Sequence, residues 1–257
     1  MDILRKELNL IYRSQSLDSE TLSDWTLDLC KKKVSALVSL NNACAVITDA
    51  SNDSSYIFAG SFAALLGITD KTSLYLKLNS SDEDLIYNRL HPEDLVEKRM
   101  LEYEFFKFVH PLSLPDKLNY KATCRIRIKD KSGRYVFVNN STQILQPSPA
   151  GKIWLILCCY DLSPDQTLGE GIAPGIVNNC SGEIVSLSFS NKRNRLLTAR
   201  EKEILMLIQE GKLSKQIADI LEISIHTVNR HRQNILEKLS VGNSVEAVIA
   251  AKAMKLL

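Results

Sequence analysis

The stretch that decides the fold of the C-terminal part of this chain is residues 213–239, which read LSKQIADILEISIHTVNRHRQNILEKL. Apolar residues recur at spacings of three and four on both sides of Glu222, which predicts two short helices joined by a turn. Ser214 and Ser224 precede the two apolar runs and are expected to cap these helices, because a serine oxygen accepts from free amide groups at a helix start. The pattern indicates a helix-turn-helix.

Two further helices are predicted around this pair. Thr198-Ala199-Arg200-Glu201 is a capping box that opens a helix ended by Gly211. Ser244 is expected to cap a fourth helix, from Val245 to Met254. Four short helices with short connections predict a compact all-α domain over residues 196–257.

The third of these helices, residues 225–238, is predicted to have two distinct faces. Placed at 100° intervals from Val228, Ile225, Ile235 and Leu239 fall on the buried face. The outward face is polar and consists of His226, Asn229, Arg230 and Gln233. Arginine pairs with guanine, and asparagine or glutamine with adenine, at the edges of bases in the major groove. The third helix is therefore predicted to recognise double-stranded DNA.

Charge is distributed unevenly along the chain. Residues 191–257 carry 12 Lys and Arg against 7 Asp and Glu, a net charge of +5, whereas residues 1–190 carry 20 against 23, a net charge of −3. Basic charge confined to one domain is what contact with a polyanion requires.

The C-terminal motifs resemble the LuxR-type helix-turn-helix. They comprise Leu197-Thr198-x-Arg200-Glu201-x-Glu203-x-Leu205, Gly211, Ser214-Lys215-x-Ile217-Ala218-x-x-Leu221-x-Ile223-Ser224 and Thr227-Val228-x-x-His231-x-x-Asn234-Ile235-x-x-Lys238-Leu239. The resemblance implies DNA binding, with the third helix in the major groove, and a homodimer formed largely through the fourth helix.

By position, the resemblance assigns base contacts to Asn229, Arg230 and Gln233, and phosphate contacts to Ser214, Lys215 and Thr227. Asn229 stands where the family very often has lysine, so the DNA sequence that is recognised does not follow from the family.

Two further residues of the third helix have different expected roles. His231 falls near the edge of the core, where it is expected to pack and orient the helix; a base contact is the alternative. The stem of Arg232 is expected to lie along the core and its head to reach a backbone phosphate.

The rest of the chain predicts an α+β domain. Residues 3–40 have helical periodicity, residues 43–48 and 56–58 predict a strand pair, and 61–66 a short helix. His91-Pro92-Glu93-Asp94 opens a helix that reaches about Val109. Three consecutive strands follow, at 120–129, 135–146 and 153–160, which indicates an antiparallel sheet. Two strands, a helical middle and three strands resemble the PAS fold.

The predicted domains are a helical segment (1–40), a PAS-like sensory or dimerisation domain (41–162), a linker (163–195) and the DNA-binding domain (196–257). Within the linker, residues 176–177 and 184–187 are expected to pair as a small hairpin.

No catalytic or metal-binding pattern is recognised, so an enzyme is not expected. The six cysteines lack metal-ligand spacing and are expected to be reduced thiols. His91 and His110 are not expected to bind haem, and the flavin-binding motif of photosensory PAS domains is not recognisable. The apolar lining of the PAS-like domain (Cys124, Ile126, Phe137, Cys158) fits a filled core or a pocket, which leaves open an unidentified small ligand.

The longest apolar run, residues 153–160, is too short to cross a bilayer, and a cytoplasmic location is expected. The sequence thus predicts a bacterial transcription regulator whose PAS-like domain receives a small-molecule or protein signal. The alternative is an interaction protein whose helical module docks on another regulator. A third hypothesis makes the PAS-like domain a dimerisation scaffold without a ligand.

Overall fold

The computed structural model describes residues 11, 15–67, 74–81, 83–167, 169, 171–187, 197–239, 241–253 and 256–257. The chain divides into two compact units, one over Leu8–Leu187 and one that contains Ser188–Leu257. They are called the N-terminal and C-terminal domains below.

The N-terminal domain is built on an antiparallel sheet with the strand order β3-β2-β1-β6-β5-β4-β7-β8. The strands are β1 (Cys44–Asp49), β2 (Ser54–Ala59), β3 (Leu74–Leu78), β4 (Tyr120–Lys129), β5 (Tyr135–Pro147), β6 (Ile153–Leu162), β7 (Gly175–Asn178) and β8 (Ile184–Ser186). β1 pairs with both β2 and β6, so the first and last strands of the predicted PAS-like order lie side by side. The two strands, the helices and the three strands predicted from the sequence are present, but the sequence did not predict β3, which lies between α3 and α4.

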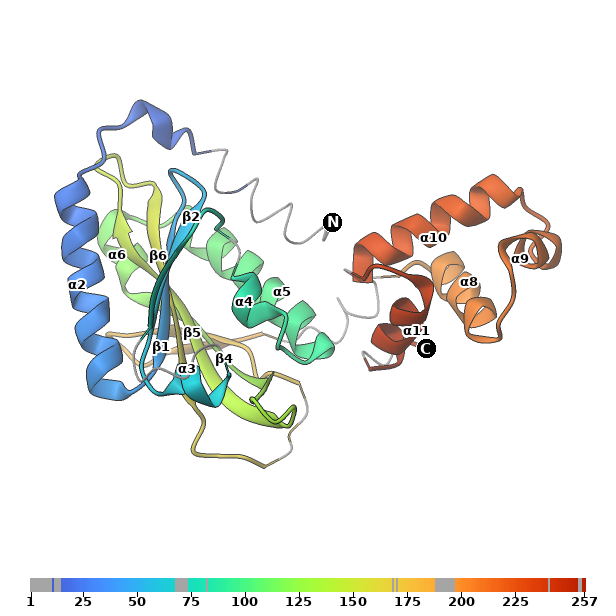
Figure 1. Cartoon of the computed structure of the whole chain (residues 1–257). Helices are drawn as coiled ribbons and strands as arrows, with labels where there is room; N and C mark the ends of the chain where they lie inside the picture. The colour runs from blue at the N-terminus through green and yellow to red at the C-terminus, as the bar shows by residue number, and fades with distance from the viewer. Residues whose placement is uncertain are drawn as a thin grey trace. The chain divides into compact units, whose positions relative to one another are not determined.

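Helix α2 (Asp24–Asn41) covers one face of this sheet (Figure 1). Its buried side consists of Leu27, Cys30, Val34 and Val38, which pack on side chains of β1, β2 and β6. A short 3-10 helix, η1 (Leu17–Ser19), precedes it. The predicted helical segment also includes residues 1–10 and 12–14, which lie outside the described residues.

The helical middle covers the other face (Figure 1). It comprises α3 (Phe62–Leu65), α4 (Asp84–Tyr87), α5 (Pro92–Val109) and α6 (Leu114–Leu118). α5 begins as the sequence predicts, with Pro92 at its first position and Glu93 and Asp94 in its first turn. β4 alternates buried and half-buried residues, as its sequence predicts.

The predicted linker is wrong over its first part. β7 adds to the free edge of β4, with Ile176 opposite Ala122, and β8 pairs with β7. Residues 163–187 therefore belong to the N-terminal domain, and the hairpin extends its sheet. Residues 188–196 lie outside the described residues.

The C-terminal domain contains α8 (Ala199–Gln209), α9 (Ser214–Ile220), α10 (Ile225–Leu239) and α11 (Ser244–Ala253). Both halves of the capping box at Thr198 are present. The predicted caps at Ser214 and Ser244 are wrong by one residue. Leu213 precedes α9 and donates its amide to Gln216, and Asn243 Oδ1 caps α11 by accepting from the amide of Glu246.

Candidate nucleic-acid interface

Helix α10 starts at a side-chain cap. Ser224 Oγ accepts from the amide of Thr227 at 3.0 Å and shares a hydrogen bond of 2.8 Å with the Thr227 hydroxyl. Glu222, in the turn before it, has a left-handed φ of 52°. The cap satisfies one of the free amides at the helix start and fixes where α10 begins.

The faces of α10 are largely those predicted. Val228, Ile235 and Leu239 are buried. The recognition face (Asn229, Arg230 and Gln233) is exposed. Ile225, which the helical projection places on the buried face, is the first residue of α10 and is 50% exposed.

The predicted phosphate-contacting residues lie at the starts of α9 and α10. Lys215 is exposed, and Ser214 and Thr227 are half-buried. Ser214 is the first residue of α9. Helix starts carry free amide groups and a partial positive charge, which suits contact with phosphate.

His231 is half-buried, and its Nδ1 atom is buried without a hydrogen-bond partner among the described residues. This position fits the packing role more closely than a base contact.

The head of Arg232, which is expected from the sequence to reach a backbone phosphate, binds two serine hydroxyls within the domain. Its Nη1 donates to Ser214 Oγ at 3.1 Å and its Nη2 to Ser244 Oγ at 2.8 Å. The guanidinium group therefore joins α10 to the starts of α9 and α11. This bridge could not be predicted from local sequence patterns, because the two serines are 30 residues apart.

An ion pair between the half-buried Lys238 and the buried Glu201 joins α8 to α10. Lys238 Nζ lies 2.6 and 2.8 Å from the carboxylate oxygens of Glu201, which also accepts from the amide of Thr198. Burial alone would raise the pKa of Glu201, but the hydrogen bonds from Lys238 and Thr198 hold it below its ordinary value. Glu201 therefore remains ionised and anchors the recognition helix.

The interior of the N-terminal domain holds a cluster of polar side chains beneath α4 and α5. Lys98 is fully buried; it pairs with Glu102 and donates to the Tyr87 hydroxyl at 2.9 Å. Tyr160 donates to the buried carboxyl group of Glu83. Sequence reasoning missed this cluster, because the charged residues of α5 are typical of a solvated face. The predicted lining residues Cys124, Ile126, Phe137 and Cys158 are all buried.

Burial governs the protonation of this cluster. It raises the pKa of Glu83. Burial alone would lower the pKa of Lys98, but the carboxylate of Glu102 raises it above its ordinary value. Lys98 is therefore charged and Glu83 retains its proton to higher pH than an exposed glutamate does.

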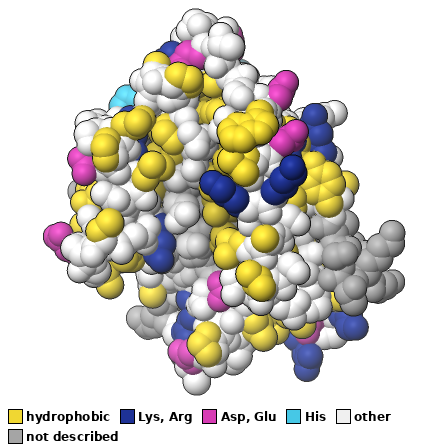
Figure 2. Space-filling view, turned by 90° about the vertical axis from the view of Figure 1, so that its left-hand side faces the viewer, with side chains coloured by type: hydrophobic (Ala, Val, Ile, Leu, Met, Phe, Trp, Pro, Cys, Tyr) yellow, Lys and Arg dark blue, Asp and Glu magenta, His cyan; other side chains and the backbone are white. Residues whose placement is uncertain are grey.

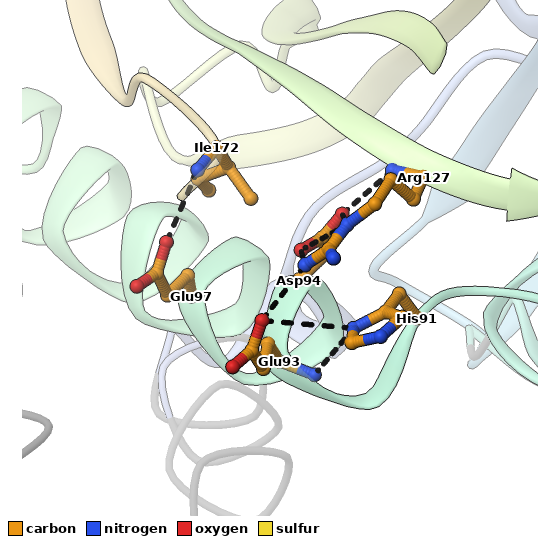
Figure 3. Close-up of polar contacts among 6 residues, drawn as sticks. All are labelled: His91, Glu93, Asp94, Glu97, Arg127 and Ile172. Carbon is orange, nitrogen blue, oxygen red and sulfur yellow. Dashed lines mark hydrogen bonds and ion pairs between the residues drawn. The ribbon is translucent and has the colours of Figure 1, made fainter. Parts of the chain in front are cut away.

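The start of α5 is anchored to β4 (Figure 3). Arg127 on β4 pairs with Asp94 through two nitrogens and with Glu93 at 2.9 Å. His91, Glu93 and Asp94 are close enough to share a cation, but Arg127 already pairs with both carboxylates. The group is best described as an ion-pair anchor.

One turn further along α5, Glu97 accepts from the amide of Ile172 at 3.2 Å (Figure 3). Ile172 is buried and precedes β7. α5 thus contacts both the polar cluster and the segment that leads to the β7–β8 hairpin.

A groove of about 630 Å³ lies at the end of α2. Leu37 and Val38 of α2, Ala45 of β1 and Leu162 of β6 are among the residues that line it. Figure 2 shows the α2 side of the molecule, with apolar side chains gathered beside Lys or Arg groups. Trp25 and Leu40 of α2 are 72% and 85% exposed.

The described residues include no helix with the length and apolarity to cross a membrane.

Four helices, of which the third carries an exposed polar face, define a helix-turn-helix domain. The sequence profile described as "Bacterial regulatory proteins, luxR family" matches residues 195–251. The C-terminal domain is therefore a LuxR-type helix-turn-helix domain, which confirms the resemblance predicted from its motifs.

Curated relatives match about a quarter to a third of the chain. The "Uncharacterized response regulatory protein YgeK" of Escherichia coli is 48% identical over 72 residues, 28% of this chain and 48% of that protein. The "Transcriptional activator protein SolR" of Ralstonia solanacearum is 47% identical over 64 residues, 25% of this chain and 27% of SolR. The "Transcriptional regulatory protein LiaR" of Bacillus subtilis is 40% identical over 82 residues, 30% of this chain and 39% of LiaR. The matched segments thus span less than half of each relative.

Two solved structures align over most of the chain. Vibrio cholerae VqmA is 16% identical over 88% of each chain, with a TM-score of 0.32. Escherichia coli SdiA is 16% identical over 99% of each chain, with a TM-score of 0.23. These scores are too low to establish a common arrangement.

Proposed function

We propose that this chain is a transcription regulator that binds double-stranded DNA in a sequence-specific manner through α10. The observation that carries this proposal is the recognition face of Asn229, Arg230 and Gln233, exposed on a capped helix whose other face is buried. Transcription regulators and activators among the relatives of this domain support it.

In the proposed complex, α10 enters the major groove and the recognition face contacts base edges. Ser214, Lys215 and Thr227 contact backbone phosphates. These contacts supply affinity and position the domain, whereas the base contacts supply specificity. His231 orients the helix by packing.

The N-terminal domain is proposed to receive the signal, either a small molecule or a protein partner. Because α5 contacts both the buried polar cluster and the amide of Ile172, a shift of α5 would reach the segment that precedes the C-terminal domain. The active form is proposed to be a homodimer, which presents two recognition helices to two half-sites. We propose that it acts in the cytoplasm, where its six free thiols remain reduced.

The test is the selection of bound fragments from the source genome with the full chain, followed by affinity measurements on the selected duplex. Arg230→Ala is expected to weaken binding to that duplex about 5- to 150-fold, corresponding to about 1–3 kcal/mol, and to relax specificity at one base pair. Arg230→Lys is the matched variant that keeps the charge. An equal loss on the selected duplex and on random DNA would refute a base contact by Arg230.

A further inference from the structure

The side chain of Arg232 lies between the core and the recognition face of α10. On a helical projection it falls about 40° from the buried Val228 and about 60° from Asn229, at the border between the buried face and the recognition face. It is half-buried, and two of its nitrogens bind serine hydroxyls. It therefore does not lie on the surface predicted to touch bases.

The apolar contacts of α10 leave its position incompletely fixed. α10 packs on α8, α9 and α11, mainly through Val228, Ile235 and Leu239. Apolar contacts are not directional, whereas hydrogen bonds require defined distances and angles. A planar guanidinium group that bridges two hydroxyls fixes how far α10 can rotate or slide against its neighbours.

Ser214 connects this bridge to the proposed phosphate contacts. A serine hydroxyl can accept one hydrogen bond and donate another at the same time. Because Ser214 Oγ accepts from Arg232, its hydroxyl proton remains available to a phosphate oxygen. The bridge thus sets the distance between the helix that contacts bases and a residue that contacts the backbone.

We propose that Arg232 is a positioning residue for DNA recognition, which acts by bridging Ser214 at the start of α9 and Ser244 at the start of α11. This inference rests on the proposed function, since it concerns how α10 is held for base contacts. It gives Arg232 a role distinct from the phosphate contact expected from its sequence position.

The variant that tests this role is Arg232→Lys in the full chain. Lysine keeps the positive charge but has a single ammonium group in place of the planar guanidinium group with its two terminal nitrogens, so it cannot hold both serines in the same geometry. The affinity is measured on the genome-selected duplex and on a scrambled duplex of equal composition, over a series of salt concentrations. Hydrogen exchange of the free protein is followed at the starts of α9 and α11.

Arg232→Lys is expected to lose about tenfold in affinity on the selected duplex, equal to about 1.4 kcal/mol, and less than about twofold on the scrambled duplex. The salt slope is expected to stay unchanged, because the charge is retained. Exchange at the two helix starts is expected to rise. Arg230→Lys is the matched control: it should reduce selective binding without changing exchange at either helix start.

Three outcomes would overturn the proposal: wild-type selectivity in Arg232→Lys, unchanged exchange at both helix starts, or an equal loss of affinity on both duplexes, which indicates a contact with the DNA backbone rather than a role in specificity. If Arg232→Lys unfolds the C-terminal domain, Ser244→Ala replaces it, because this variant removes one acceptor and keeps Arg232. Unchanged selectivity of Ser244→Ala then refutes the bridge. A wild-type chain that does not distinguish the two duplexes contradicts the proposed function itself and, with it, the role of Arg232.

Discussion

Replacement of Lys98 by methionine is expected to destabilise the N-terminal domain strongly. Lys98 is fully buried, its ammonium group pairs with Glu102 and donates to Tyr87 at 2.9 Å, and it lies 4.6 Å from the centre of the Tyr87 ring. Methionine fills a similar volume but leaves the carboxylate of Glu102, 6% exposed, without its cation.

The expected cost follows from this uncompensated charge. Removing one partner of a buried ion pair costs about 3–5 kcal/mol, whereas replacing both partners by apolar residues of similar volume is often neutral. Lys98→Met should therefore lose about 3–5 kcal/mol, and Lys98→Met with Glu102→Leu should recover about 2 kcal/mol or more of it. Lys107→Met, at an exposed position in the last turn of the same helix, should cost less than about 1 kcal/mol.

The chain provides its own probe for this measurement. Its two tryptophans, Trp25 and Trp154, both lie in the N-terminal domain, and Trp154 is buried with its indole nitrogen 3.1 Å from Asp49. Tryptophan fluorescence during urea unfolding therefore reports this domain alone. If the double variant is as unstable as Lys98→Met, the stability arises from packing of the lysine stem rather than from the ion pair, and the reasoning is refuted.

Three further predictions concern single side chains. Burial raises the pKa of Glu83, so the stabilising effect of the protonated carboxyl group is present below the ordinary pKa of 4.5 and is lost as the pH rises through the folded-state pKa. Glu83→Gln should therefore raise the urea midpoint at pH 8 but not at pH 4. An equal shift at both pH values would argue against a buried titrating carboxyl group. The pKa of Glu201 is lowered, so the contribution of its carboxylate to stability is present above the ordinary pKa of a glutamate and is lost as the pH falls. Glu201→Gln should cost about 2 kcal/mol of stability at pH 7 and less near pH 3, measured by circular dichroism of the C-terminal domain. A loss that does not depend on pH would contradict this. Leu213 precedes α9 in extended conformation and is 70% exposed. Leu213→Ser should add about 1 kcal/mol of stability, because a serine hydroxyl can cap α9. Hydrogen exchange of α9 that is no slower than in the wild type would contradict a cap.

The features predicted correctly from the sequence are those with local causes. The four C-terminal helices follow from apolar spacing and from caps such as Thr198 and Ser224, whose partners lie three residues away. β4 is recognisable because one of its faces is buried and the other is not, which imposes a period of two. The recognition face follows from the same local periodicity.

The features that were missed depend on distant partners. The attachment of β7 to β4 joins residues more than 50 positions apart, so residues 163–187 looked like a linker. Lys98 and Glu102 resemble a solvated pair at i and i+4 until α5 is placed against the sheet. β3 is a five-residue edge strand, too short for its alternation to be distinctive. The bridge from Arg232 to Ser214 and Ser244 likewise needs three helices in place.

The central claim is that the C-terminal domain recognises a DNA sequence. The most direct test measures the affinity of the full chain for the genome-selected duplex and for its scrambled counterpart at several salt concentrations. The account predicts that log K falls steeply with log salt on both duplexes, with a slope of about −0.9 per neutralised phosphate, and that the selected duplex binds about 1,000-fold more tightly or better. Equal affinity for the two duplexes, or an affinity that salt does not change, would contradict it and favour a module that docks on another protein.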